Sequence, residues 1–312
     1  MAYQRADFGP LAATKYGIGF HWTTWTMPRV GEPVSFPEAV EAFDVPALVD
    51  LARRTGAGHV LFPATHALHW LPGPNPEVDR ILPGRTCERD LLGEIADALA
   101  AVGLPLIVYY HHGLNERGAE HDPAWAEAVG AYAEDLSVYY DNYCRVLSWM
   151  GEHYGPRIRA WWFDAGSVLE RLAPAPWGLL TAVAKAGYPD RLVTYNSGIE
   201  SHKLYTEYQD YWAGEANYLG YRPEGGPLTP SGLPWFSFTA WNRISPSWGV
   251  WGIDREMRER DLPPPSVEEV AAYLEAFWAV GGAVAFNMLC YQDGSVVEGH
   301  AEVLEEIRRR YR

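Results

Sequence analysis

The stretch Arg159–Gly166 reads RAWWFDAG and places a carboxylate, Asp164, directly after a short apolar and aromatic run. A run of this length, closed by a glycine, is typical of a buried strand. A carboxylate at the end of such a strand is costly to desolvate unless it has a partner or a chemical task. The stretch therefore predicts a strand that ends in a candidate functional residue. An aspartate that only caps the next loop is the alternative.

Similar short apolar runs recur along the chain and alternate with longer amphipathic segments. The predicted strands are Tyr16–Trp22, His59–Pro63, Leu106–Tyr110, Arg159–Phe163, Leu192–Tyr195 and Ala283–Met288, with two short ones near Tyr211 and in Trp235–Thr239. The predicted helices span about 44–54, 89–102, 123–154, 177–186, 266–280 and 298–310. About eight strands that alternate with helices predict a TIM (β/α)₈ barrel. We expect one catalytic domain over residues 1–312, without a C-terminal β-sandwich.

The composition narrows the classes of partner. The chain has 25 basic and 40 acidic residues, a net charge of −15, which disfavours nucleic acids and anionic membranes. Three cysteines imply no disulfide framework, and the start of the chain has no apolar signal region. We expect a cytoplasmic protein that binds a small molecule, needs no cofactor or metal, and could form a homo-oligomer through exposed aromatic residues.

Polar and aromatic residues gather where the predicted strands end. In a TIM barrel the carboxyl ends of the strands carry the functional site. These residues are His21, Trp22, His66, His69, Trp70, Tyr110, His111, His112, Asp164, Asn196 and Asn287, with Glu215 after a probable sixth strand. A single histidine there would usually be a packed one, whereas several at successive strand ends favour a binding site. The 14 tryptophans add weak support, because aromatic rings also stack on sugar rings.

Several motifs resemble one family in the right order along the chain. Four stretches carry the resemblance: Gly17–Trp22 (GIGFHW), Trp162–Gly166 (WFDAG), Asp210–Glu215 (DYWAGE), and Gly281–Met288 (GGAVAFNM) with Asp293-Gly294. Weaker matches are Arg89–Glu94 (RDLLGE) and Ser247–Gly249 (SWG). The chain resembles the α-L-fucosidases of glycoside hydrolase family 29 over about residues 16–310.

The resemblance implies a retaining mechanism with two carboxylates. Asp164 would be the nucleophile and Glu215 the acid/base, with the carboxyl groups about 5–5.5 Å apart. The resemblance also implies that His21 and His66 bind sugar hydroxyls, that Tyr110 lies near the nucleophile, and that Trp22, Trp162 and Asn196 belong to the binding site.

The chain also departs from the family pattern. The second of two adjacent family histidines is absent after His66, and Ser197 stands where members have arginine. Fucose specificity is therefore less firmly predicted than hydrolysis, because a site built for a hydroxyl discriminates through it. We expect that His69, His111, His112 or Arg222 replaces the lost contacts, and that Trp70 also belongs to the substrate-binding site.

Two other readings stay open at this point. The residues His66, His69, His111, His112 and Asp164 could ligate zinc or manganese in a metal-dependent barrel hydrolase or isomerase. Alternatively, the barrel could bind a glycoside or oligosaccharide without cleaving it. Metal analysis would test the first reading, and substitution of Asp164 would test the second.

Overall fold

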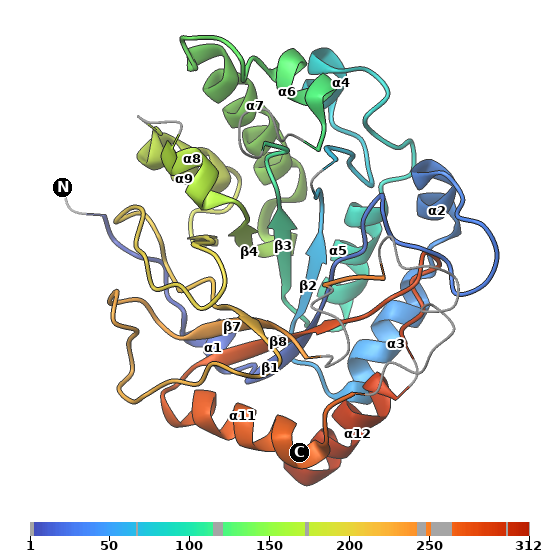
Figure 1. Ribbon diagram of the computed structural model, residues 1–312, viewed down its shortest axis with the longest axis vertical. Coiled ribbons are helices and arrows are strands. Elements are labelled where there is room, and N and C mark those ends of the chain that lie inside the picture. Colours follow the sequence, from blue (N-terminus) through green and yellow to red (C-terminus); the bar gives the residue numbers. More distant parts are fainter. Residues whose placement is uncertain are drawn as a thin grey trace.

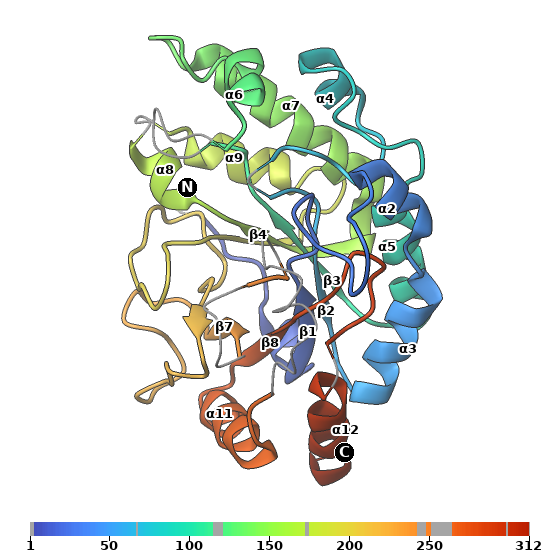
Figure 2. The same ribbon diagram turned by 45° about the vertical axis from the view of Figure 1, so that its right-hand side comes forward.

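The computed structural model describes residues 3–66, 68–114, 121–171, 175–241, 248–250, 264–297 and 299–311. Eight parallel strands form one curved sheet with helices around it (Figures 1 and 2). The strands are β1 (Tyr16–Phe20), β2 (Val60–Pro63), β3 (Leu106–Tyr110), β4 (Ile158–Phe163), β5 (Leu192–Tyr195), β6 (Glu215–Asn217), β7 (Phe236–Ala240) and β8 (Ala283–Met288). The predicted barrel class is confirmed.

The strands follow one another around the sheet in the order β5-β4-β3-β2-β1-β8-β7-β6. The seam between β5 and β6 is spanned by the segment that precedes β6. The backbone N–H of Asp210 donates to the carbonyl of Val193 at 2.8 Å, and the Val193 N–H donates to the Asp210 carboxylate at 2.8 Å. Thr194 adds a hydroxyl bond of 2.6 Å to the carbonyl of Tyr211. The carboxylate of Asp210 thus completes the ring where strand pairing ends.

Helices connect the strands on the outside of the barrel. They are α1 (Gly9–Ala12), α2 (Phe36–Ala42), α3 (Val45–Thr55), α4 (Pro76–Ile81), α5 (Leu91–Ala101), α6 (Pro123–Val129), α7 (Ser137–Tyr154), the 3₁₀ helix η1 (Gly155–Arg157), α8 (Gly166–Arg171), α9 (Trp177–Ala184), α11 (Val267–Ala279) and α12 (His300–Tyr311). In the described part of the chain, no helix combines the length and apolarity needed to cross a bilayer.

Local signals explain most of the helix boundaries. Asp44 caps α3, and Gly56 ends it in the left-handed conformation. Ser266 and Glu269 form a capping box at the start of α11. The single long helix predicted over 123–154 is wrong. Gly130, at φ 92°, ends α6, and a second helix, α7, begins after it.

Side chains of the strands alternate between two cores, as the period of two in a strand requires. One set fills the barrel interior: Leu61, Ile107, Tyr109, Ala160, Trp162, Phe236, Phe238, Ala283 and Ala285. The other set packs between sheet and helices: Ile18, Phe20, Trp22, Val60, Phe62, Val108, Tyr110, Trp161 and Phe163. Because both faces of β1, β2, β3, β5, β7 and β8 are buried, these strands are largely apolar and carry no visible alternation.

Candidate active site

Asp164 follows β4 directly and lies on the face of the strand that Trp162 presents to the barrel interior. Its carboxylate accepts three hydrogen bonds. Tyr109 donates its hydroxyl to Oδ2 at 2.5 Å, Asn196 donates its amide to Oδ1 at 2.9 Å, and the backbone N–H of Ala165 donates to Oδ1 at 2.7 Å. The side chain is partly buried and accessible at its edge. The carboxylate is thus held in one orientation from three sides.

The loop after Asp164 is folded to make the third of these bonds. Ala165 has φ 54°, a left-handed conformation that costs a non-glycine residue about 1 kcal/mol or more. Its carbonyl lies 3.2 Å from Nε2 of His112, and Nδ1 of His112 accepts the Leu114 N–H at 3.2 Å. The ring of His112 therefore carries its proton on Nε2 and donates it to Ala165. Because both ring nitrogens of His112 bond the backbone, His112 stabilises the loop and is not placed to bind a ligand.

Glu215 opens β6 and reaches the same amide group. Nδ2 of Asn196 donates to Oε2 of Glu215 at 2.7 Å and to Oδ1 of Asp164 at 2.9 Å. Because the two N–H bonds of a planar amide diverge by about 120°, the two acceptor oxygens are about 5 Å apart. Two residues that are far apart in sequence are therefore brought to one point by Asn196.

The two carboxyl groups have opposite pKa shifts. Burial opposes the ionisation of Asp164, but His111 and the hydrogen bonds from Tyr109, Asn196 and Ala165 outweigh it and lower its pKa to about 2. Burial and the charge of Asp164 raise the pKa of Glu215 to about 7, against the hydrogen bond from Asn196. At neutral pH one group is an anion and the other can carry a proton. This division suits a nucleophile and an acid.

Aromatic side chains form a floor beneath the carboxylates. His21 lies parallel to Phe238 at 5.2 Å and edge-on to Tyr109 at 4.8 Å between ring centroids. Tyr109 in turn stacks on Trp162 at 5.2 Å, and Trp162 meets Phe238 edge-on at 5.6 Å. All four rings are buried. The carboxylates consequently face a closed aromatic layer and not the open interior of a channel.

Two further histidines, His66 and His111, lie beside His21 at this floor. His66 stacks on Tyr109 at 5.9 Å and lies 5.7 Å from His21 and 5.8 Å from His111. Burial lowers the pKa of all three, that of His21 to about 4. They are neutral at pH 7, so each can accept and donate a hydrogen bond.

The proton position can be assigned for two of the rings. Nδ1 of His111 accepts the Gly113 N–H at 2.9 Å, so its proton is on Nε2. Nδ1 of His21 lies 3.0 Å from Oδ1 of Asn287, whose amide donates to the carbonyl of Trp248. His21 therefore carries its proton on Nδ1, and its Nε2 is an acceptor.

Three predicted site residues lie elsewhere. Trp22 points outward from the barrel, stacks near Phe36 and Phe43, and donates its indole N–H to the carbonyl of Gln292 at 3.0 Å. Tyr110 also points outward and bonds His69 at 2.8 Å. The ring of His69 stacks on Trp125 at 3.6 Å. The side chains of Trp22, Tyr110 and His69 thus belong to the layer between sheet and helices and are not brought to the carboxylates. Tyr110 is near Asp164 only through its backbone, because its carbonyl accepts the Asp164 N–H at 2.9 Å.

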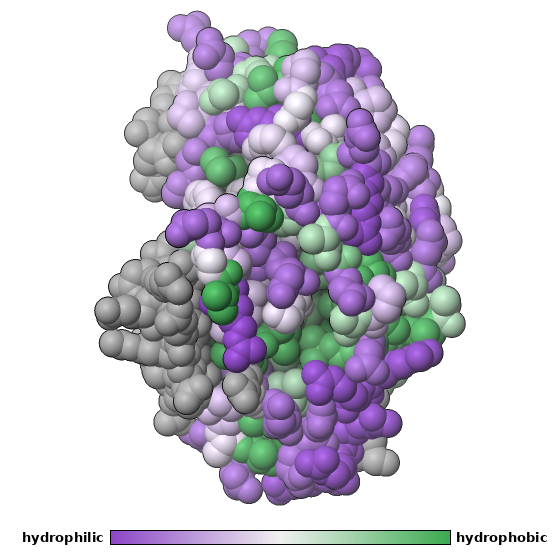
Figure 3. All heavy atoms as spheres, turned by 90° about the vertical axis from the view of Figure 1, so that its right-hand side faces the viewer, coloured by the Kyte–Doolittle hydropathy of each residue, from purple (hydrophilic) through white to green (hydrophobic). Residues whose placement is uncertain are grey.

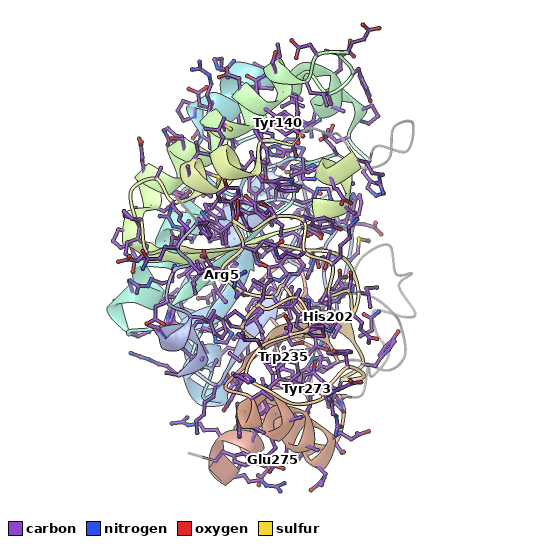
Figure 4. The ribbon with its side chains drawn as sticks, turned by 90° about the vertical axis from the view of Figure 1, so that its left-hand side faces the viewer. Arg5, Tyr140, His202, Trp235, Tyr273 and Glu275 are labelled. Atoms are coloured by element: carbon purple, nitrogen blue, oxygen red, sulfur yellow. The ribbon has the colours of Figure 1, made fainter. Side chains whose placement is uncertain are left out.

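Two further predictions are not brought to the carboxylates. Trp70 lies in a separate groove beside Phe36, with Arg85 5.2 Å from its ring centre. Arg222 is exposed in the segment after β6. In that region His202 stacks on Trp212 at 4.5 Å and touches Trp235, close to it in Figure 4. The aromatic rings of His202, Trp212 and Trp235 thus pack on one another and cover the outside of the barrel here.

The predicted site residues omitted Phe238, and also Tyr109, although Tyr109 lies at the polar end of the third predicted strand. Both are inward-facing residues of the interior core, and Tyr109 is the residue that bonds the nucleophile candidate. The signal was available in the pairing of β3 with β4, where Tyr109 lies beside Trp162. Ser247, which belongs to a motif quoted above, and Ala67, which follows His66, lie outside the described residues.

A metal centre has no support from the described geometry. Among the residues that the structure describes, no three histidine, cysteine, aspartate or glutamate side chains converge as metal ligands would. The neighbours of Asp164 are hydrogen-bond donors instead.

Comparisons with known proteins agree with this geometry at the level of fold. No protein-family model and no curated protein sequence matches the chain. Among solved structures, an α-L-fucosidase from Lactobacillus casei in complex with α-L-fucose product has a TM-score of 0.66 at 18% identity, covering 97% of this chain and 100% of that one. The chain shares its fold with the α-L-fucosidases.

Two further α-L-fucosidase structures show the same likeness. Isoenzyme 1 from Paenibacillus thiaminolyticus has a TM-score of 0.69 at 19% identity, covering 97% of this chain and 74% of that one. A family 29 enzyme from Bacteroides thetaiotaomicron, trapped as a covalent intermediate with 2-fluoro-fucosyl fluoride, has a TM-score of 0.66 at 15% identity. The match to this enzyme covers 99% of this chain and 77% of the enzyme. The resemblance predicted from the sequence to the α-L-fucosidases is thus confirmed for the fold.

Proposed function

We propose that the chain is a retaining exo-glycoside hydrolase that removes α-L-fucose from its substrates, with Asp164 as nucleophile and Glu215 as acid/base. The observation that carries this proposal is the amide of Asn196, which bonds one oxygen of each carboxyl group. The resulting separation of about 5 Å suits direct attack on a sugar carbon and is too short to hold a water between them. The fold shared with α-L-fucosidases supports the choice of sugar.

In the first step the carboxylate of Asp164 attacks the anomeric carbon. The bond between that carbon and the glycosidic oxygen breaks, and Glu215 gives its proton to the departing oxygen. The product is a glycosyl ester on Asp164 and a free alcohol. The raised pKa of Glu215, near 7, keeps the proton in place until the bond breaks.

In the second step Glu215, now ionised, takes a proton from a water molecule. The water oxygen attacks the anomeric carbon, the ester bond breaks, and the carboxylate of Asp164 is restored. Two successive inversions at one carbon give net retention of configuration. With the ester formed, Asp164 no longer carries the negative charge that helped to raise the pKa of Glu215. The pKa of Glu215 therefore falls, and Glu215 ionises more readily.

The surrounding side chains would bind the sugar. His21 offers an acceptor at Nε2 and His111 offers a donor at Nε2, and their rings lie 5.7 and 5.8 Å from that of His66. Neutral imidazoles suit hydroxyl groups, which both give and accept hydrogen bonds. The apolar floor that includes Trp162 and Phe238 would face the C–H groups and the methyl group of a deoxy sugar.

A screen of aryl glycosides tests the proposal. The purified protein is assayed with 4-nitrophenyl α-L-fucoside, β-D-galactoside and α-L-arabinoside, with Asp164→Asn as the matched control. We expect the α-L-fucoside to be hydrolysed fastest, and Asp164→Asn to lower kcat/KM at least about 1,000-fold. Binding of fucose without hydrolysis of any of these compounds would indicate the non-catalytic alternative.

A further inference from the structure

An apolar groove lies beside the carboxylate site, between the loop that follows β1 and the start of α2. Its volume is about 840 Å³, within the usual range of small-molecule pockets. Four large apolar side chains line it, namely Trp25, Met27, Phe36 and Trp70, together with Val34 and two prolines. On the face of the molecule that carries α2, apolar residues gather among hydrophilic ones (Figure 3).

Two of the three hydroxyl groups that line the groove are already bonded within the protein. No lining residue is charged, and the hydroxyl-bearing residues are two threonines and Ser35. Thr26 accepts the Thr23 N–H at 2.8 Å, and Ser35 donates to Glu38 at 2.6 Å. A second sugar would need hydrogen-bond partners for its hydroxyl groups, because unpaired polar groups are costly to desolvate. The lining therefore suits an apolar group better than a sugar.

Two hydrogen bonds between the side chain of Gln292 and the backbone of Val34 fix one wall of the groove. The side chain of Gln292 accepts the Val34 N–H at 2.9 Å and donates to the Val34 carbonyl at 2.8 Å. The Gln292 backbone N–H also bonds the carbonyl of Met27 at 3.0 Å. These bonds fix the wall before any ligand arrives, and a preformed wall lowers the entropic cost of binding.

One side chain connects the groove to the reacting centre. Trp25 lines the groove and meets His66 edge-on at 5.5 Å. His66 stacks on Tyr109, and Tyr109 bonds Asp164. The groove and Asp164 are thus linked by the rings of Trp25, His66 and Tyr109. The groove therefore lies next to His66, a predicted sugar-binding residue, although none of the residues that bond Asp164 lines it.

We propose that this groove binds the leaving group of the substrate, and that this group is an uncharged aromatic system of two or more fused rings. The inference rests on the proposed glycosidase function and names its substrate class. Trp25, Phe36 and Trp70 supply ring faces and edges for such a group. A single ring would fill only part of the groove, whereas a fused system would contact both of its walls.

Two α-L-fucosides with leaving groups of similar acidity test the inference. 2-Naphthyl and phenyl α-L-fucoside differ by one fused ring, so leaving-group chemistry is nearly matched. We expect kcat/KM to be at least about tenfold higher for the naphthyl compound, because the extra ring is buried on the groove wall. Equal values for the two compounds would overturn the inference.

A pair of valine variants locates the effect. Val34→Asp introduces a charge into the groove at a side chain that is 48% exposed, and Val138→Asp makes the same change on α7 at a side chain that is 55% exposed. We expect Val34→Asp to reduce the naphthyl-to-phenyl ratio to about one, and Val138→Asp to keep the wild-type ratio. A full preference in Val34→Asp would place the leaving group elsewhere and contradict the inference.

α-L-Fucosyl fluoride separates the two proposals, because its leaving group is too small to reach the groove. Turnover of the fluoride without a naphthyl preference overturns the groove inference alone. Failure to turn over the fluoride overturns the proposed function, and the inference with it. Turnover together with a preference that Val34→Asp abolishes supports both.

Discussion

Tyr109 and Tyr110 are consecutive residues of β3, and their hydroxyl groups serve opposite faces of the sheet. Tyr109 points into the barrel and donates to Asp164 at 2.5 Å. Tyr110 points toward the helices and meets His69 at 2.8 Å. Both rings are buried. The same chemical group is therefore placed once at the carboxylate of Asp164 and once in the packing layer.

The tyrosine pair supplies a matched test. Tyr109→Phe removes a hydrogen bond that holds the pKa of Asp164 down. We expect kcat/KM to fall about tenfold or more, and the acid limb of the pH profile to move to higher pH. Tyr110→Phe should lower the free energy of unfolding by about 1 kcal/mol and leave the pH profile unchanged. Equal effects of the two variants on the pH profile would contradict the assignment.

Asn196 should couple the two carboxyl groups. Asn196→Ala removes a donor that lowers the pKa of both Asp164 and Glu215. We expect kcat/KM to fall about 100-fold through loss of alignment, and the alkaline limb to move to higher pH. Asn142 is a buried asparagine that bonds Val129 on α6, far along the chain from these residues. Asn142→Ala, as the control, should lose stability without a shift of the alkaline limb.

The pH dependence of the wild type follows from the two pKa shifts. With phenyl α-L-fucoside, whose leaving group needs a proton, kcat/KM should decline as pH rises through about 7, where Glu215 loses its proton. No acid limb is expected above about pH 3, because Asp164 stays ionised there. A flat profile from pH 5 to pH 9 would be inconsistent with Glu215 as the acid.

The raised pKa of Glu215 also has a consequence for stability. Its ordinary value is 4.5, so the folded protein binds more protons than the unfolded chain between about pH 4.5 and 7. The free energy of unfolding should therefore fall as pH rises through this window. Glu215→Gln removes this dependence, and we expect it to be more stable than wild type by about 1–3 kcal/mol at pH 8 and by little at pH 4. Denaturant unfolding at both pH values measures the difference, which would be absent if Glu215 titrated normally.

The sequence predicted best those site residues that are polar and directly follow an apolar strand. Asp164 stands out as a carboxylate after an aromatic strand, and the barrel follows from the repeated strand and helix pattern. The inward or outward direction of a side chain could not be read in the same way. Because both faces of β1 and β3 are buried, Trp22 and Tyr110 look like His21 and Tyr109 in the sequence. A shift of one residue exchanges the two faces, and only the register with the neighbouring strands distinguishes them, β8 for β1 and β4 for β3.

The joint action of Asp164 and Glu215 on one bond can be measured with 2-fluoro-α-L-fucosyl fluoride and intact-protein mass spectrometry. The fluorine at C2 slows both steps, and the good leaving group lets the ester accumulate. The account predicts a mass increase of one 2-fluoro-fucosyl group, located by peptide mapping on the peptide that contains Asp164, and its absence in Asp164→Asn. An adduct on another carboxylate, or no adduct from a protein that releases fucose with inverted configuration, would contradict it.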